Sequence, residues 1–259
     1  MIKAAVLGSP ITHSLSPKLH KKAYEILGIA GEYTAVDVDE KTFPNFYAES
    51  LKGGWTGFSL TMPLKEIVIR YCPNISETVF RINSANTLYR VGNEWQATST
   101  DHLAFENLLQ VSADSRVAII GGGGTARAAA GALNSKVANI DVLLRSPERL
   151  VAMARAAPDV LLTHLEMSTD LNSYDLIIQS TPAHVFDGYA QNLKSARGVL
   201  VECLYKPWPT ALVNRYTELG GRVISGRDLL VEQALFQIEI FSGETFDFDS
   251  MRTQLLDHI

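Results

Sequence analysis

A lysine and an aspartate stand at positions where the chain could form an acid–base pair. Lys65 lies two residues after Pro63, near the expected start of a helix, where the positive end of the helix dipole disfavours a cation by about 0.3 to 1 kcal/mol at an exposed site. A partner such as Asp101, which follows an extended segment ending at residue 100, would offset that cost. Two interpretations are open at this point: a catalytic pair, or an exposed surface lysine and an aspartate that caps the helix beginning at residue 102.

Hydroxyl groups gather in the loop after the first expected strand. Residues 8–17 read GSPITHSLSP, and the loop leaves the carboxyl end of a strand, where open α/β sheets bind ligands. Ser16 is equally well placed to cap the following helix, whereas Ser14 has no such structural role. Asn86 and Tyr205 each adjoin an extended segment and could supply hydrogen bonds or simply form turns.

A glycine-rich turn is the clearest local motif. Residues 117–129 read VAIIGGGGTARAA, an apolar strand followed by glycines and an alanine-rich helix. Gly121, Gly123 and Ala126 fit the G-x-G-x-x-G/A spacing, in which glycine permits a tight turn and the close approach of a pyrophosphate to the N–H groups of the helix terminus. The alternative is a turn that merely uses glycine, but the surrounding alternation of strands and helices favours nucleotide binding.

The next expected strand ends in the sequence LLRSPER at residues 143–149, without an acidic residue at its tip. An NAD-binding fold usually places Asp or Glu there, on the ribose 2′-hydroxyl. Arg145 and Arg149 could instead hold a 2′-phosphate, because a guanidinium pairs well with phosphate oxygens. The alternative is a pair of solvated arginines on a loop.

The elements that must position these residues alternate between strand and helix, which indicates an α/β fold. Early extended segments are expected at 4–7, 33–38, 57–61 and 87–90, and helices at 17–27 and 63–71, each opened by proline. Short apolar strands typical of a parallel sheet follow at 116–120, 140–144, 160–165, 176–180, 199–203 and 222–224, with helices expected between them. A long helix is expected over 226–243 and a second from about 249, with a domain boundary near 101–115.

Composition excludes several classes of protein. The 259 residues are 46% hydrophobic and 20% charged, which excludes a disordered or fibrous chain, and a net charge of −5 without a basic cluster argues against nucleic acid and membrane surfaces as partners. Two isolated cysteines, six histidines without ligand spacing and no apolar run of about 20 residues predict no metal and no membrane span. We expect a cytoplasmic protein, monomeric or homodimeric, with a small-molecule substrate.

Seven segments, in order along almost the whole chain, resemble those of the shikimate dehydrogenase family. They are SLSP at 14–17, LTMPLKE at 60–66, NTL at 86–88, TD at 100–101, GGGGTARA at 121–128, YKPWPT at 205–210, and residues 226–233. The resemblance implies reversible, NADP-linked oxidation of the C3 hydroxyl of shikimate to 3-dehydroshikimate. Close alternatives are a quinate/shikimate or aminoshikimate-type dehydrogenase, and a non-catalytic sensor that keeps the ligand sites is an alternative of another class.

The resemblance also implies roles for individual residues. Lys65 and Asp101 would be catalytic. Ser14 and Ser16 would bind the carboxylate of the substrate, with Tyr205 nearby. The ring hydroxyls would be bound by Thr61, Asn86 and Gln233. NADP would lie on Gly121, Gly123, Gly124, Thr125, Ala126, Arg145, Ser146, Arg149, Thr181 and Gly226.

The implied fold has an N-terminal mixed-sheet α/β substrate domain over 1–104, a Rossmann-type doubly wound dinucleotide-binding domain over 105–225, and C-terminal helices over 226–259 that return to the substrate domain. The chain departs from the family pattern at NSANT (83–87), STDH (99–102), LRS (144–146) and QSTPAHV (179–185). These changes fall mainly around the nicotinamide and adenine ends of the cofactor, so they concern cofactor preference more than substrate class.

Overall fold

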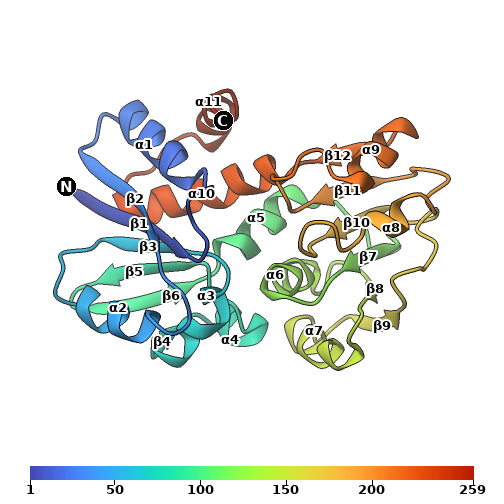
Figure 1. The fold of residues 1–259 in the computed structure, drawn as a ribbon, viewed down its shortest axis with the longest axis horizontal. Coiled ribbons are helices and arrows are strands. Elements are labelled where there is room, and N and C mark those ends of the chain that lie inside the picture. The colour runs from blue at the N-terminus through green and yellow to red at the C-terminus, as the bar shows by residue number, and fades with distance from the viewer. The chain divides into compact units, whose positions relative to one another are not determined.

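The computed structural model describes residues 1–259, and they form two α/β units, each built around its own six-stranded sheet (Figure 1). The first unit comprises Met1–Leu103 and Leu230–Ile259, and the second comprises Ala104–Leu229. The chain passes from one unit to the other within helix α5 (Thr100–Leu108) and returns within helix α10 (Gly226–Ser242). None of the helices has both the length and the apolar character needed to span a bilayer.

The first unit contains the mixed sheet, as predicted. Its strands are β1 (Ile2–Gly8), β2 (Gly31–Asp37), β3 (Gly57–Leu60), β4 (Asn74–Ile75), β5 (Thr87–Val91) and β6 (Glu94–Thr98), in the order β2-β1-β3-β5-β6-β4. Only β5 runs antiparallel to its neighbours, β3 and β6. The carboxyl ends of β1, β3 and β6 and the amino end of β5 therefore meet at one edge of the sheet.

Side chains of β1 alternate between two apolar cores because successive strand residues point to opposite faces. Ala4 and Val6 join the core beneath α1 (Ser16–Leu27), α10 and α11 (Phe248–Leu256). Ala5 and Leu7 join the other core. The helical segments on that side are α2 (Phe43–Ser50), α3 (Leu64–Ile67), the 3-10 turn η1 (Val68–Arg70) and α4 (Glu77–Ile82). With both faces covered, the open edge of the sheet is left to carry polar side chains.

The second unit contains an all-parallel, Rossmann-like sheet, also as predicted. Its strands are β7 (Val117–Ile120), β8 (Asn139–Leu143), β9 (Leu161–Leu165), β10 (Leu176–Gln179), β11 (Val199–Glu202) and β12 (Arg222–Ile224), in the order β12-β11-β10-β7-β8-β9. The order reverses direction between β7 and β10. Open α/β sheets bind their ligands at such a switch point, outside the carboxyl ends of the strands.

Two expectations about helices are wrong. The expected helix at 63–71 is only the four-residue α3 followed by η1. No helix connects β9 to β10, because residues 166–175 are rich in Ser, Thr, Asp and Asn, which favour turns. Helical segments do follow the other strands of this unit: α6 (Gly124–Leu133), η2 (Pro147–Arg149), α7 (Leu150–Ala156), α8 (Asp187–Ala190) and α9 (Ala211–Glu218).

Candidate active site

Lys65 and Asp101 are in direct contact in the first unit. Lys65 follows β3, Asp101 follows β6, and the distance from Nζ to Oδ2 is 2.6 Å. The side chains are 20% and 10% exposed, so Lys65 is not an exposed surface lysine. Asp101 is not the cap of α5 either, since that helix already begins at Thr100 and the hydroxyl of Ser99 accepts the N–H of His102. Because α3 has only four residues, the dipole penalty expected at Lys65 is small.

Asn86 fixes the other carboxylate oxygen of the pair. This buried side chain, just before β5, donates from Nδ2 to Asp101 Oδ1 at 2.9 Å and to Gln233 Oε1 at 3.2 Å. Its own Oδ1 accepts the backbone N–H of Thr100 at 2.7 Å and the hydroxyl of Thr87 at 3.2 Å. The Asp101 carboxylate is therefore held by two donors on separate oxygens, Lys65 and Asn86, in a preorganised polar cluster.

The local structural role expected for Ser16 in the hydroxyl loop belongs to Ser14. Ser16 is the first residue of α1 and does not cap it, since the residue before the helix is Leu15. Ser14 has the structural role instead, because its Oγ accepts the N–H of Ser16 at 3.3 Å. Ser16 is 5% exposed. Burial raises the pKa of the Tyr33 hydroxyl, and a hydrogen bond with Ser16 opposes part of that rise. Both serines lie at the same sheet edge as Lys65.

Thr61 lies at this edge as well, between β3 and α3. Gly8 at the end of β1 permits its approach, since a Cβ at that glycine would lie 2.4 Å from Thr61 Cγ2. Lys65, Asp101, Asn86 and Gln233 thus form one hydrogen-bonded network. Ser14, Ser16 and Thr61 lie at the same edge of the sheet.

In the second unit the glycine-rich turn follows β7 at the switch point. Gly121 has φ +111°, and a Cβ there would lie 2.7 Å from Ser180 Oγ. Gly123 caps α6 in an extended conformation with open space around it, and Ala126 is fully buried. These are the three requirements of a dinucleotide turn: a tight bend, close backbone approach to a pyrophosphate, and close packing of helix on strand. Gly124 and Thr125 lie in the first turn of α6, where backbone N–H groups have no partner within the helix and are suited to binding an anion.

Two of the other cofactor candidates of this unit, Arg149 and Thr181, border the glycine turn. Arg145 and Arg149 follow β8, are exposed and form no ion pair, with Ser146 between them. A Cβ at Gly122 would lie 3.1 Å from Arg149 Cβ, so this arginine borders the turn. Thr181 follows β10 and is held by Gln179, whose Oε1 accepts the N–H of Thr181 at 3.0 Å.

Tyr205 and Gly226 lie close together in the second unit, beside a residue that sequence reasoning missed. A Cβ at Gly226 would lie 2.4 Å from the carbonyl oxygen of Leu204, so glycine is needed there for packing. Glu202, at the end of β11, is fully buried and accepts the N–H of Leu204 at 3.1 Å and the hydroxyl of Thr210 at 2.8 Å. Burial raises the pKa of Glu202 to about 7. The signal available in the sequence was an acidic residue closing an otherwise apolar strand.

A second missed residue is Gln237, which is fully buried on α10. It lies four residues after Gln233, and therefore on the same helix face, and it bonds to Ser59, Thr87 and the backbone of Asn86. Two glutamines at helical spacing in an apolar helix were the signal that could have identified it.

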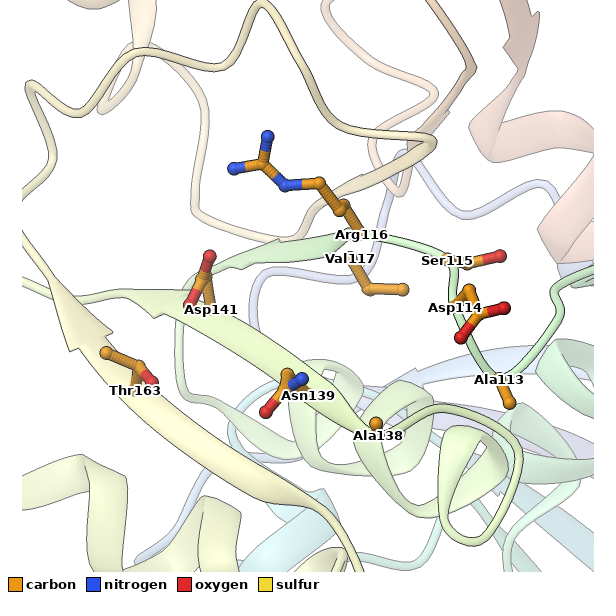
Figure 2. Close-up of a pocket in the computed structure, with 9 residues that line it drawn as sticks. All are labelled: Ala113, Asp114, Ser115, Arg116, Val117, Ala138, Asn139, Asp141 and Thr163. Atoms are coloured by element: carbon orange, nitrogen blue, oxygen red, sulfur yellow. The ribbon is translucent and has the colours of Figure 1, made fainter.

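Figure 2 shows a pocket of about 390 Å³ at the amino-terminal ends of β7, β8 and β9. Two of its charged side chains bond within the protein: Arg116 donates to Ser173 at 2.6 Å and lies over the Tyr174 ring, and Asp141 accepts the Tyr174 hydroxyl at 2.6 Å. The pocket lies at the edge opposite to the one at which open sheets bind ligands, and we assign it no ligand.

A parallel sheet of this strand order with a glycine turn at its switch point is typical of dinucleotide-binding proteins, and a lysine–aspartate pair is of a type that can transfer protons. Residues 6–88 match the sequence model of the shikimate dehydrogenase substrate-binding domain, and residues 103–196 match that of shikimate / quinate 5-dehydrogenase. The chain belongs to the shikimate dehydrogenase family.

Relatives at about 30% identity span nearly the whole chain. An NADP-dependent shikimate dehydrogenase from an Exiguobacterium species is 31% identical over 249 residues, which cover 92% of each protein. The crystal structure of Mycobacterium tuberculosis shikimate dehydrogenase superimposes with a TM-score of 0.90 at 32% identity, with all of both chains covered. That of Thermus thermophilus shikimate 5-dehydrogenase, in complex with NADP(H) and shikimate, gives 0.86 at 26% identity, again with all of both chains covered.

The same fold occurs in more distant proteins with other ligands. A Listeria monocytogenes shikimate 5-dehydrogenase in complex with shikimate and NAD superimposes with a TM-score of 0.83 at 18% identity, with 98% of this chain and 96% of that one covered. A 5-ketofructose reductase of Gluconobacter gives 0.82 at 21% identity, with 99% and 98% covered. The fold alone therefore fixes neither the cofactor nor the substrate.

Proposed function

We propose that this protein is a shikimate dehydrogenase, which oxidises the C3 hydroxyl of shikimate reversibly to 3-dehydroshikimate with NADP. The observation that carries the proposal is the 2.6 Å contact between Lys65 and Asp101 at a sheet edge that also bears Asn86 and Gln233. The first unit would bind the substrate and the second NADP.

Lys65 holds the reacting hydroxyl and accepts its proton during oxidation. Asp101 orients Lys65 and stabilises its cationic form, while Asn86 keeps the second carboxylate oxygen occupied. General acid–base assistance of this kind contributes about 10² to 10⁴ in rate. The chemistry that bound NADP supplies is acceptance of the hydride from C3.

The substrate's carboxylate is bound by hydroxyl groups rather than by a cation. Ser14 keeps its hydroxyl hydrogen for a ligand, because its bond to Ser16 uses the oxygen only as acceptor. Ser16 supplies a further hydroxyl. Ser14→Ala and Ser16→Ala are each expected to weaken shikimate binding, measured by calorimetry, and unchanged affinity in both would remove this role.

NADP is the proposed cofactor because two unpaired arginines, Arg145 and Arg149, follow β8 where an NAD-specific site would present an acid. Arg149 borders the glycine turn through Gly122.

Absorbance at 340 nm with shikimate and either NADP or NAD tests the function. We expect turnover with shikimate and a higher kcat/KM for NADP than for NAD. A higher kcat/KM for quinate than for shikimate would support a quinate/shikimate enzyme instead. Binding of shikimate and NADP without any turnover would contradict the enzyme and support a sensor.

A further inference from the structure

We propose that Gln237 is a positioning residue for the reaction: it fixes the orientation of the Asn86 carboxamide, and through it the Asp101 carboxylate, without contacting the substrate. The kinetic consequence of this inference rests on the proposed function. Its structural part stands on the hydrogen bonds of the first unit alone.

Gln237 uses both ends of its amide. The side chain is fully buried, and Oε1 accepts the Ser59 hydroxyl at 2.6 Å. Nε2 donates to Thr87 Oγ1 at 2.9 Å and to the backbone carbonyl of Asn86 at 3.2 Å. A reversed amide would place an N–H₂ group against the Ser59 hydroxyl and an oxygen against the Asn86 carbonyl oxygen, so these partners favour one orientation.

These hydrogen bonds also determine which bond Asn86 accepts from Thr87. Because Thr87 Oγ1 accepts from Gln237, its hydrogen is available to donate to Asn86 Oδ1, 3.2 Å away. That bond, with the N–H of Thr100 on the same oxygen, turns the Nδ2 of Asn86 toward Asp101. Gln237 thus acts on the acid–base pair through two intermediate residues.

The chain of bonds extends in the other direction toward the hydroxyl loop. Tyr33 donates to Ser59 Oγ at 2.5 Å, and its ring stacks on His20 with 3.9 Å between centroids. Burial raises the pKa of Tyr33 and lowers that of His20 to about 3, so both side chains are neutral around pH 7 and the donor direction is fixed there. Ser16 contacts the same tyrosine. The proposed carboxylate-binding loop and the acid–base pair are therefore joined by one buried chain of hydrogen bonds.

Gln237→Met, with Ile238→Val as control, separates positioning from packing. Methionine matches the length of glutamine but removes both polar groups, and Ile238 is a fully buried neighbour on α10 without a polar role. We expect kcat with shikimate to fall about 10- to 100-fold in Gln237→Met, with KM for NADP unchanged, and to stay at the wild-type value in Ile238→Val. A kcat for Gln237→Met equal to that of the control would overturn the proposal.

Ser59→Ala gives a second test with a smaller change in volume. We expect a lower kcat, and the double variant Ser59→Ala/Gln237→Met should be little slower than Gln237→Met alone, because the two residues act through one path. Fully additive losses, or wild-type kcat in Ser59→Ala, would contradict the path from Ser59 to Asn86.

A readout that needs no turnover keeps this inference separate from the proposed function. Hydrogen exchange of the Asn86 side-chain amide, followed by NMR, should be accelerated in Gln237→Met and not in Ile238→Val. If the wild type fails to oxidise shikimate, the proposed function is wrong, yet the exchange rates still decide whether Gln237 orders Asn86. Equal exchange in both variants overturns the positioning role.

Discussion

The two units build their sites from different parts of the chain. In the first unit, side chains bond to side chains: Lys65, Asp101, Asn86 and Gln233 are linked by bonds of 2.6 to 3.2 Å. In the second unit the site is made of backbone, with a positive-φ Gly121 and an unobstructed Gly123 at the start of α6. The first arrangement fixes proton donors and acceptors, and the second leaves space and N–H groups for an anion.

This difference has a consequence for substitutions. A change in the first unit alters which atom donates to which, so its effects on turnover should be large and non-additive. A change in the second unit alters space or a charge beside the phosphates, so its effects should fall on cofactor binding or stability. Asp101 in the first unit and Glu202 in the second are both buried carboxylates, which makes the contrast testable with the same chemical change.

The largest effect is expected for Asp101→Asn. The amide keeps an oxygen for Asn86 but removes the negative charge beside Lys65, so kcat with shikimate should fall at least about 100-fold while NADP affinity is retained. Steady-state kinetics and cofactor titration measure the two quantities. Wild-type kcat in this variant would show that the pair is not part of the proton transfer.

Glu202→Gln makes the same change in the second unit, and its effect should be on stability. The folded-state pKa of Glu202 is raised from 4.5 to about 7, so the folded protein holds this proton more tightly than the unfolded chain. The protonated Glu202 therefore adds about 3 kcal/mol to the free energy of unfolding below pH 4.5, and this contribution is lost as pH rises to about 7. The difference in unfolding free energy between wild type and variant, measured in urea from pH 4.5 to 8, should fall by that amount. A difference independent of pH would contradict this prediction.

Two glycines of the turn should respond differently to alanine. Gly121→Ala should lower the unfolding free energy by about 1 kcal/mol or more, because its φ is +111° and its Cβ would meet Ser180. Gly123→Ala should leave stability unchanged, since nothing lies within 4 Å of its Cβ, yet weaken NADP binding at least about tenfold. Thermal unfolding and fluorescence titration measure these quantities. Unchanged NADP affinity in Gly123→Ala would argue against the pyrophosphate site.

Arg145→Ala should have the smallest effect. Removing one exposed guanidinium should raise KM for NADP about tenfold and leave KM for NAD unchanged, because only NADP carries the 2′-phosphate. Equal changes for both cofactors would place Arg145 elsewhere on the dinucleotide.

Local patterns predicted the parallel sheet and the glycine turn, because these depend on apolar strands, strand-to-helix junctions and glycine at fixed spacing. The mixed first sheet was implied by the family resemblance, and the two-residue strand β4 was not predicted. For Lys65 and Asp101 two interpretations stayed open, a catalytic pair or a surface lysine and a helix cap. Their contact depends on β3 and β6 ending at one edge of the sheet, which no local pattern shows. The capping position was expected at Ser16 and is wrong, since the helix begins one residue earlier than expected, whereas the substrate-binding role of Ser14 and Ser16 stays a prediction. Gln237 was missed because its one local signal, a second glutamine at helical spacing in an apolar helix, does not reveal the partners on β3 and β5 that it meets in the fold.

The separation of kcat from shikimate affinity in Lys65→Ala tests the central claim most directly. If Lys65 accepts the hydroxyl proton, its contribution arises mainly in the transition state, so kcat should fall at least about 100-fold while the Kd for shikimate, measured by calorimetry, changes less than about tenfold. A variant that retains wild-type kcat and shows only a raised KM would contradict the claim and leave Lys65 as a substrate-binding residue.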